Sequence, residues 1–119
     1  MDFIREISAT NMKNLRVDAE EFIKLYNEGK CILLDVRDDF ERKVWAVNIG
    51  IHIPASKLPE NLDKLPKDKI IITACPKKDR SNSSAMYLRS QGFDARYLTD
   101  GLTGLVERLS GGKAKDIKI

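Results

Sequence analysis

Two short apolar runs, at 31–36 and 69–74, are the clearest features of the hydrophobic pattern along the chain. Both are continuous, too short for helices and rich in β-branched residues, which is typical of strands. Continuous patterning is expected where both faces of a sheet are covered, as in parallel α/β sheets. We therefore predict buried strands at these positions, a weaker strand at 95–99, and a short one at 51–53 before a proline.

Helical spacing of apolar side chains fills the segments between these strands. It occurs over 19–26 behind a capping Asp18, and over 102–109 behind Asp100. We expect a third helix over about 81–91, and mostly loop in the proline-containing stretch that precedes the second long strand. Strands that alternate with helices of this length indicate βαβ units. The prediction is an α/β fold with a central, mainly parallel sheet and helices on both faces.

The length of 119 residues suits one domain. We expect a single domain over 1–119, with 1–16 as an N-terminal extension and 112–119 as a flexible tail. A net charge of +3 does not favour nucleic acid or membrane as a partner, and we expect neither. The apolar runs are too short to cross a bilayer, and the first residues lack a signal-peptide core, so we expect a cytoplasmic protein.

The two cysteines, Cys31 and Cys75, have neither a disulfide nor a zinc spacing. We find no cluster of metal ligands and no glycine-rich nucleotide loop, so we predict no metal and no cofactor. Cys31 begins a predicted strand, and we interpret it as a buried core residue. The only histidine, His52, is far from Cys75 in sequence, and a Cys–His pair is open at this stage. We favour a structural role for His52.

Cys75 ends a predicted strand, and a short polar loop and a serine-rich helix start follow it. Sites in open α/β sheets form at the carboxyl ends of strands, and a helix N-terminus favours an anion such as a thiolate. The positive charges of nearby Lys77, Lys78 and Arg80 also favour the thiolate, whereas the negative charge of Asp79 disfavours it. The pattern predicts a reactive thiol in an anion-binding loop; the competing interpretation is a buried structural cysteine before an ordinary turn.

Several segments together resemble the rhodanese-like domain family. Asp35-Val36-Arg37 is similar to the Asp-Val-Arg motif of that family, and 51–54 matches its short third strand and proline. The segments 90–93 and 100–102 resemble the last helix and a glycine-containing turn. The similarity extends from about residue 17 to residue 111.

This resemblance implies a sulfurtransferase in which Cys75 accepts sulfur as a persulfide from a small anionic donor such as thiosulfate. The sulfur would then pass to cyanide, a thiol or an acceptor protein. The loop after Cys75 would hold the persulfide with its main-chain N–H groups. The predicted substrate-binding residues are Lys77, Lys78, Asp79, Arg80 and Ser81. We interpret Asp35 and Arg37 as a buried structural pair that joins strand ends and loops. The resemblance also implies that this pair holds the main chain of the site.

The loop departs from the family pattern in two respects. Pro76 has no N–H group, so the loop loses a donor next to the nucleophile. A glycine common in such loops is also absent. Both changes leave open a catalytically weak or inactive module that binds a partner or carries sulfur. A related cysteine phosphatase is a further alternative. Four residues separate Cys75 from Arg80 here, whereas such phosphatases have one residue more between their cysteine and arginine.

Overall fold

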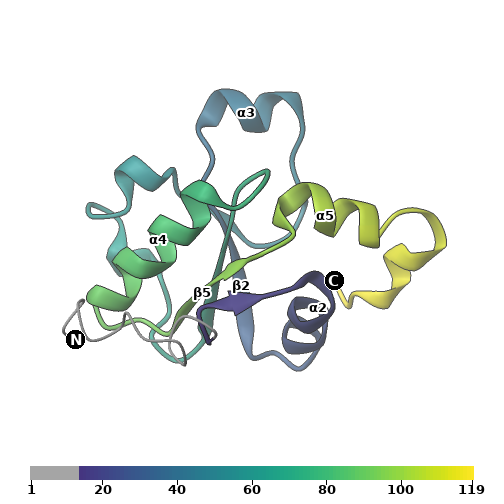
Figure 1. Ribbon diagram of the computed structural model, residues 1–119, viewed down its shortest axis with the longest axis horizontal. Helices are drawn as coiled ribbons and strands as arrows, with labels where there is room; N and C mark the ends of the chain where they lie inside the picture. Colours follow the sequence, from purple (N-terminus) through teal and green to yellow (C-terminus); the bar gives the residue numbers. More distant parts are fainter. Residues whose placement is uncertain (1–13) are drawn as a thin grey trace.

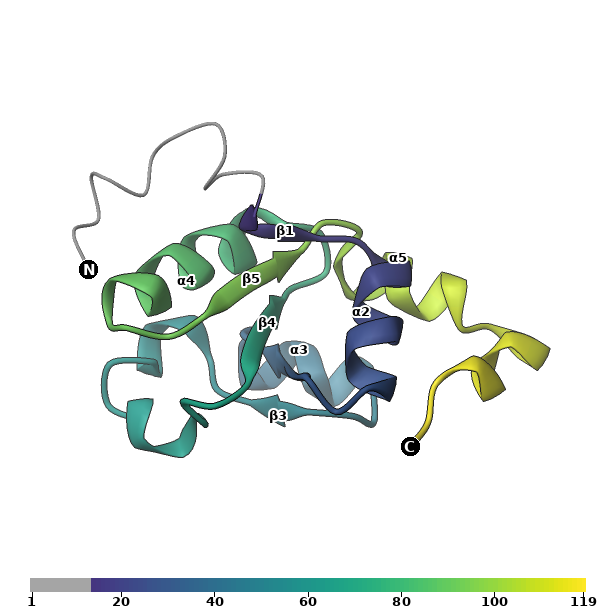
Figure 2. The same cartoon turned by 90° about the horizontal axis from the view of Figure 1, so that it is seen from below.

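The computed structural model describes residues 14–119, which form a five-stranded sheet in the order β1-β5-β4-β2-β3 (Figures 1 and 2). All neighbouring strands are parallel. The strands are β1 (Arg16–Val17), β2 (Cys31–Asp35), β3 (Ile51–His52), β4 (Ile70–Ala74) and β5 (Ala95–Leu98). The parallel sheet and four of its strands are confirmed.

Helices cover both faces of this sheet, as predicted. The helices are α2 (Ala19–Asn27), α3 (Asp39–Val44), α4 (Asp79–Ser90) and α5 (Gly101–Arg108). Helix α4 packs on one face, around the buried Ala85 and Leu88, whereas α2 and α5 pack on the other around Phe22, Leu102 and Leu105. Figure 1 shows α4 on one side of the strands and the α2–α5 pair on the other.

The acidic residues before the predicted helices lie at helix starts, but they bind differently. The Asp18 carboxylate accepts a hydrogen bond from the main-chain N–H of Glu21 at 2.8 Å, which is the expected N-cap. The Asp100 carboxylate instead accepts from the N–H of Ala19 at 3.0 Å, and so connects the start of α5 to the start of α2. Helix α4 begins two residues earlier than predicted, so its first turn includes Arg80.

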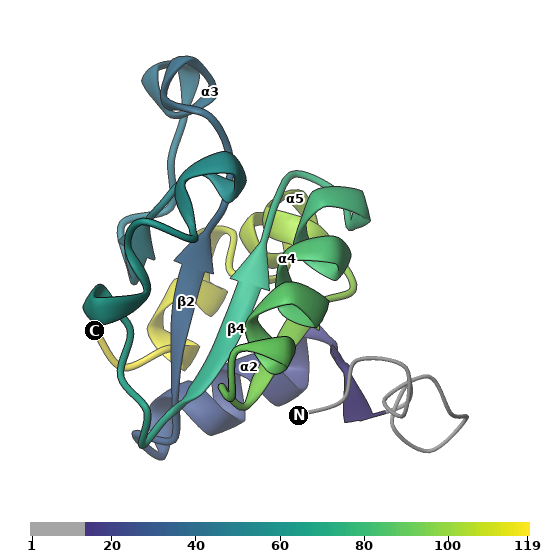
Figure 3. The same ribbon diagram turned by 90° about the vertical axis from the view of Figure 1, so that its left-hand side faces the viewer.

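Helix α3 was not predicted, and its sequence explains why. It has no buried residue, and its Phe40 and Val44 side chains are 69% and 82% exposed. With six residues and only two apolar side chains, it is too short to show a helical period in the sequence. Figure 3 shows α3 projecting beyond the carboxyl ends of β2 and β4. The loop expected over 58–68 contains one short 3-10 turn, Leu62–Lys64, and a second, Ala55–Lys57, precedes it.

Both ends of the described chain add contacts that we did not predict. Residue Arg16, which we assigned to an extension, lies in β1 and pairs with β5, and Leu15 before it is buried; residues 1–13 of that extension lie outside the described residues. The expected flexible tail packs on the body, where Ile117 is buried and Asn27 hydrogen-bonds the main chain of Asp116 and Lys118, both at 2.8 Å. None of the helices in residues 14–119 has the length and apolarity to cross a membrane.

Candidate active site

Cys75 directly follows β4, at the carboxyl edge of the sheet. It is 2% exposed, yet it lines a pocket of about 190 Å³ together with Pro76, Lys77, Asp79 and Arg80. The segment 76–78 bends, and α4 then begins, so the loop curls over the cysteine instead of extending away from it. Cys75 therefore borders a small pocket and at the same time belongs to the buried apolar cluster between the sheet and α4.

Helix α5 holds this loop from behind. The N–H of Leu102 donates to the Cys75 carbonyl oxygen at 2.8 Å, and Thr103 donates to the Pro76 carbonyl oxygen through its N–H at 3.4 Å and its Oγ1 at 2.9 Å. Gly101 has a positive φ of 69°, and a Cβ at this position would collide with the carbonyl oxygens of Pro76 and Lys77. Two successive loop carbonyls are thus fixed against the N-terminus of α5.

The main-chain N–H groups of residues 77–81 form no hydrogen bond with an acceptor in residues 14–119; the first main-chain bond here is from Asn82 N to the Lys78 carbonyl at 2.9 Å. Residues 77–79 are exposed, whereas Ser81 is fully buried. Free N–H groups at the start of a helix attract anions, and α4 is a helix of three turns. As expected, Pro76 contributes none. The loop can therefore act as an anion cradle.

Ser81 lies deeper in this site than predicted. It is fully buried, and the Cys75 thiol donates to its Oγ at 3.5 Å. The Ser81 hydroxyl donates to the Lys78 carbonyl at 3.1 Å, and its main-chain carbonyl accepts from Thr73 Oγ1 at 2.8 Å. A hydroxyl can both donate and accept, so Ser81 can bind the sulfur of Cys75 as a thiol or as a thiolate. Its contact is with the nucleophile.

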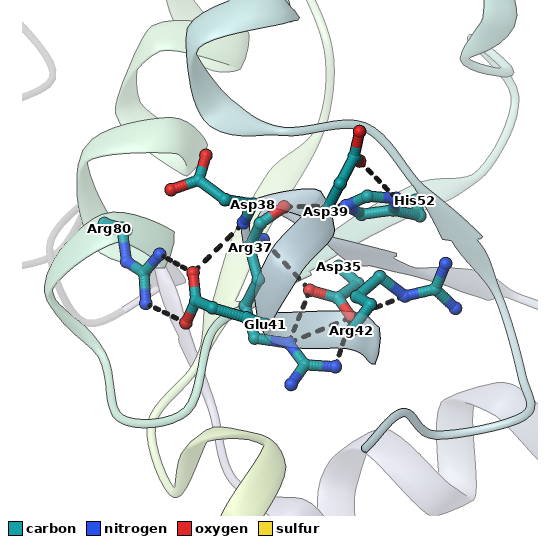
Figure 4. A network of polar contacts seen from close by, with 8 residues as sticks. All are labelled: Asp35, Arg37, Asp38, Asp39, Glu41, Arg42, His52 and Arg80. Carbon is teal, nitrogen blue, oxygen red and sulfur yellow. Dashed lines mark hydrogen bonds and ion pairs between the residues drawn. The ribbon is translucent and has the colours of Figure 1, made fainter. Parts of the chain in front are cut away.

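The three cationic residues of the loop lie in different environments. Lys77 and Lys78 are exposed, and neither forms an ion pair within residues 14–119. Arg80 forms a bidentate ion pair with Glu41 of α3, with Nη1–Oε1 and Nη2–Oε2 distances of 2.5 and 2.9 Å (Figure 4). The predicted anion-binding fork therefore already holds a carboxylate. Its Nε–H and outer N–H groups are the donors left for a ligand.

The pair between Glu41 and Arg80 stays charged over the whole working range of pH. The hydrogen bond from Arg80 lowers the pKa of the Glu41 carboxyl to about 2, and the same bond raises the pKa of the Arg80 guanidinium further above its already high value. Glu41 also accepts from the N–H of Asp38 at 3.1 Å as part of a capping box at the start of α3. The pair connects α3 to the Cys75 loop.

Asp35 and Arg37 form a buried pair, in the arrangement we predicted for them. Arg37 Nη2 and Asp35 Oδ2 are 2.8 Å apart, and the Arg37 side chain is 1% exposed (Figure 4). The guanidinium also stacks on the Trp45 ring, with its carbon 4.2 Å from the ring centroid. His52 Nε2 lies 2.6 Å from the Arg37 carbonyl oxygen, so this nitrogen is the protonated donor. His52 thus has a structural partner and does not line the Cys75 pocket.

Cys31 lies at the amino end of the strands, opposite to Cys75, and pairs with the first residue of β4. It is 3% exposed, and burial raises the pKa of its thiol to about 11. A thiol of that pKa is protonated at neutral pH and unreactive, which agrees with the predicted core role. Within residues 14–119, no three His, Cys, Asp or Glu side chains are grouped so as to hold a metal ion.

Sequence reasoning missed three contributors to the site: Glu41, Gly101 and Thr103. Glu41 was detectable in part, since Asp38 and Glu41 have the spacing of a capping box. The sequence gives no comparable signal for Thr103, because its contact with Pro76 spans 27 positions. Gly101 was noted as part of a turn, but its packing against the Cys75 loop was not anticipated.

Comparison with known proteins gives the family of this chain. The model of the rhodanese-like domain family matches residues 18–108, which is most of the chain. The chain belongs to the rhodanese-like domain family. The structural neighbours of this rhodanese-like domain include a crystal structure of a rhodanese-related protein from Thermoplasma volcanium, with a TM-score of 0.69 and 26% identity, over 78% of this chain and 91% of that one.

Two curated relatives differ in length and in name. A Bacillus subtilis protein named "Putative sulfurtransferase YtwF" is 32% identical over 83% of this chain and 87% of its own. The tRNA uridine(34) hydroxylase of Pelagibacter ubique is 28% identical over 92% of this chain, but the chain spans only 37% of its length. The family match and the relative named as a putative sulfurtransferase support an enzyme of the sulfurtransferase type.

Proposed function

We propose that this rhodanese-like domain is a sulfurtransferase that carries sulfane sulfur as a persulfide on Cys75. The observation that carries the proposal is the geometry around the sulfur. Cys75 borders a pocket whose loop carbonyls are held by α5, while the N–H groups of residues 77–81 have no acceptor in the described chain. Such donors stabilise a sulfur anion, and the resemblance to a sulfurtransferase-named relative supports the same function.

With thiosulfate as donor, the Cys75 thiolate attacks the outer sulfur of the donor. The S–S bond of thiosulfate breaks, its electron pair leaves with sulfite, and a Cys75 persulfide remains. An acceptor such as cyanide or a thiolate then attacks the outer persulfide sulfur, and the electron pair of that S–S bond returns to Cys75. No external oxidant or reductant is consumed in either step.

The loop cations have separate roles in this proposal. Lys77 lines the pocket and has no ion-pair partner in the described chain, so it can attract the negative donor. Lys78 is exposed at the N-cap of α4 and adds to the same local field. Arg80 mainly positions the Cys75 loop against α3, because Glu41 binds both of its terminal nitrogens. Asp79 limits the positive charge at the pocket mouth.

The decisive experiment treats the purified protein with thiosulfate and measures its intact mass. We expect a mass increase of about 32 Da, which is lost on treatment with cyanide, in the wild type and in Cys31→Ala. Cys75→Ser should show no such increase. An adduct that persists in Cys75→Ser, or no adduct on the wild type, would refute the proposal.

A second candidate is a slow sulfur-carrying or partner-binding module, and one observation favours it. Pro76 lacks the N–H group that would directly follow the nucleophile. Its carbonyl is bound by Thr103, so the loop is held in place here and cannot rearrange to supply another donor. In that case the persulfide would form, but its transfer to cyanide would take minutes or longer. Single-turnover kinetics with the loaded protein separates this module from the enzyme.

A further inference from the structure

The Thr103 side chain, in the first turn of α5, binds the main chain of the Cys75 loop. Its Oγ1 donates to the Pro76 carbonyl oxygen at 2.9 Å, and its N–H donates to the same oxygen at 3.4 Å, so the hydroxyl forms the shorter of the two bonds. Figures 1 and 3 show the start of α5 beside the loop that follows β4. The Thr103 hydroxyl therefore holds one peptide unit of the loop, the unit between residues 76 and 77.

This peptide unit carries the first N–H group after the nucleophile, that of Lys77, because Pro76 has none. The peptide bonds of residues 14–119 are all trans. In a planar trans peptide the carbonyl and the N–H point in opposite directions. Because the Pro76 carbonyl is bound to α5, the same unit directs the Lys77 N–H away from α5.

The Cys75 pocket is formed without α5. Its lining consists of Cys75, Pro76, Lys77, Asp79 and Arg80. The Lys77 N–H has no acceptor among residues 14–119. An N–H group that is turned away from α5 and has no acceptor in the described chain is available to a sulfur atom carried by Cys75, two residues before it.

We propose that Thr103 is a positioning residue for sulfur transfer, whose hydroxyl directs the Lys77 N–H towards the outer sulfur carried by Cys75. This inference rests on the sulfur-transfer function proposed above. When the Cys75 thiolate attacks the outer sulfur of thiosulfate, the S–S bond breaks and its electron pair leaves with sulfite. The N–H group stabilises the negative charge on the transferred sulfur, and Thr103 itself exchanges no proton or electron with it.

Thr99 provides a matched control, because it makes the same pair of contacts with a different segment. Its N–H and its Oγ1 both donate to the Val17 carbonyl oxygen, at 2.8 and 3.4 Å. Both threonines are half-buried, and they lie four positions apart. Val17 belongs to β1 and does not line the Cys75 pocket. A change of Thr to Val at either position removes the hydroxyl and nearly keeps the shape of the side chain.

The test measures single-turnover formation of the persulfide by intact mass over a range of thiosulfate concentrations. Thr103→Val should lower the maximum rate constant by about threefold to tenfold, the range of one hydrogen bond, and leave the half-saturating concentration within about twofold. Thr103→Ser keeps the hydroxyl and should stay within about twofold of the wild type in both quantities. Thr99→Val should change neither quantity. Urea unfolding of each variant checks that the fold is retained.

A merely structural role for Thr103 gives a different result. The proposal would be overturned, with the persulfide chemistry intact, if Thr103→Val kept the wild-type rate, if both Val variants lost rate equally, or if Thr103→Ser were as slow as Thr103→Val. Should Thr103→Val not fold, Thr103→Ala compared with Thr103→Ser makes the same test, because these two differ only by the hydroxyl. If no persulfide forms on wild-type Cys75, the failure lies with the proposed function and is recognised before any variant is compared.

Discussion

The two cysteines of this protein lie at opposite ends of the same region of the sheet and are almost equally buried. Cys31 begins β2 beside the first residue of β4 and is 3% exposed; Cys75 follows the last residue of β4 and is 2% exposed. Burial raises the pKa of Cys31 to about 11. Cys75 instead has a pocket, a hydroxyl neighbour and free main-chain N–H groups beside it.

This comparison teaches that exposure does not separate a structural thiol from a candidate nucleophile. The difference lies in the end of the strand at which each cysteine is placed. At the carboxyl edge a helix N-terminus follows Cys75, so main-chain N–H groups without an acceptor in the described chain come directly after it. Both cysteines belong to apolar clusters, but no helix start follows Cys31, and desolvation raises the pKa of its thiol.

Substitution of each cysteine in turn should give the largest difference in turnover. Cys75→Ser should lower turnover of thiosulfate and cyanide by at least about 1000-fold, because the nucleophile is removed. Cys31→Ala should leave turnover within about twofold and lower the free energy of unfolding by about 1 kcal/mol. Thiocyanate formation and urea unfolding measure the two quantities. Equal loss of turnover in both variants would break the comparison.

Gly101 and Gly29 provide a matched pair near the two cysteines. Both have positive φ, but only at Gly101 would a Cβ collide, with the Pro76 and Lys77 carbonyls. Gly101→Ala should therefore lower the free energy of unfolding by about 3 kcal/mol and turnover by at least about tenfold, since the loop must shift. Gly29→Ala should cost about 1 kcal/mol and leave turnover unchanged. A Gly101→Ala variant with normal turnover would show that the α5 contact does not position the loop.

An N–H group restored at residue 76 should raise the activity with thiosulfate. Pro76→Ala gives residue 76 an N–H group, and we expect kcat/KM for thiosulfate to rise by about threefold to tenfold, less than the full value of an optimal donor. Pro66→Ala, away from the pocket, is the control. A fall in kcat/KM in Pro76→Ala would mean that the proline is needed for rigidity and that its lost donor is unimportant.

The smallest expected effect concerns Glu41 and its pH dependence. The folded pKa of Glu41, about 2, lies below its ordinary value of 4.5, so its pair with Arg80 stabilises the fold above about pH 4.5 and that contribution disappears as the pH falls towards 2. The Arg80 side chain is 41% exposed, so screening limits the effect to less than about 1 kcal/mol.

Glu41→Gln should therefore be less stable than the wild type at pH 7, and the difference should vanish near pH 2. Urea unfolding at a series of pH values measures it, with the exposed Glu60→Gln as control. A difference that grows as the pH falls would contradict the assigned pair.

Much of the fold could be read from local patterns. The runs at 31–36 and 69–74 contain β2 and β4, and most of their residues are buried because both faces of the sheet are covered; the spacing over 19–26 marks a helix packed on one side. Helix α3 and strand β1 could not be read in this way. The first has no buried residue, and the second is two residues long, too short to show a period.

The sequence by itself determined the parallel α/β fold, the position of Cys75 at a strand end and the Asp35–Arg37 pair, because burial and neighbouring residues leave a local signal. Only the tertiary structure decided that Glu41 binds Arg80 and that Thr103 and Leu102 hold the loop carbonyls. These contacts join residues 27 to 39 positions apart. Their partners are chosen by how the helices pack across the sheet, and a hydrophobic pattern reports that a residue is buried without naming the residue it meets.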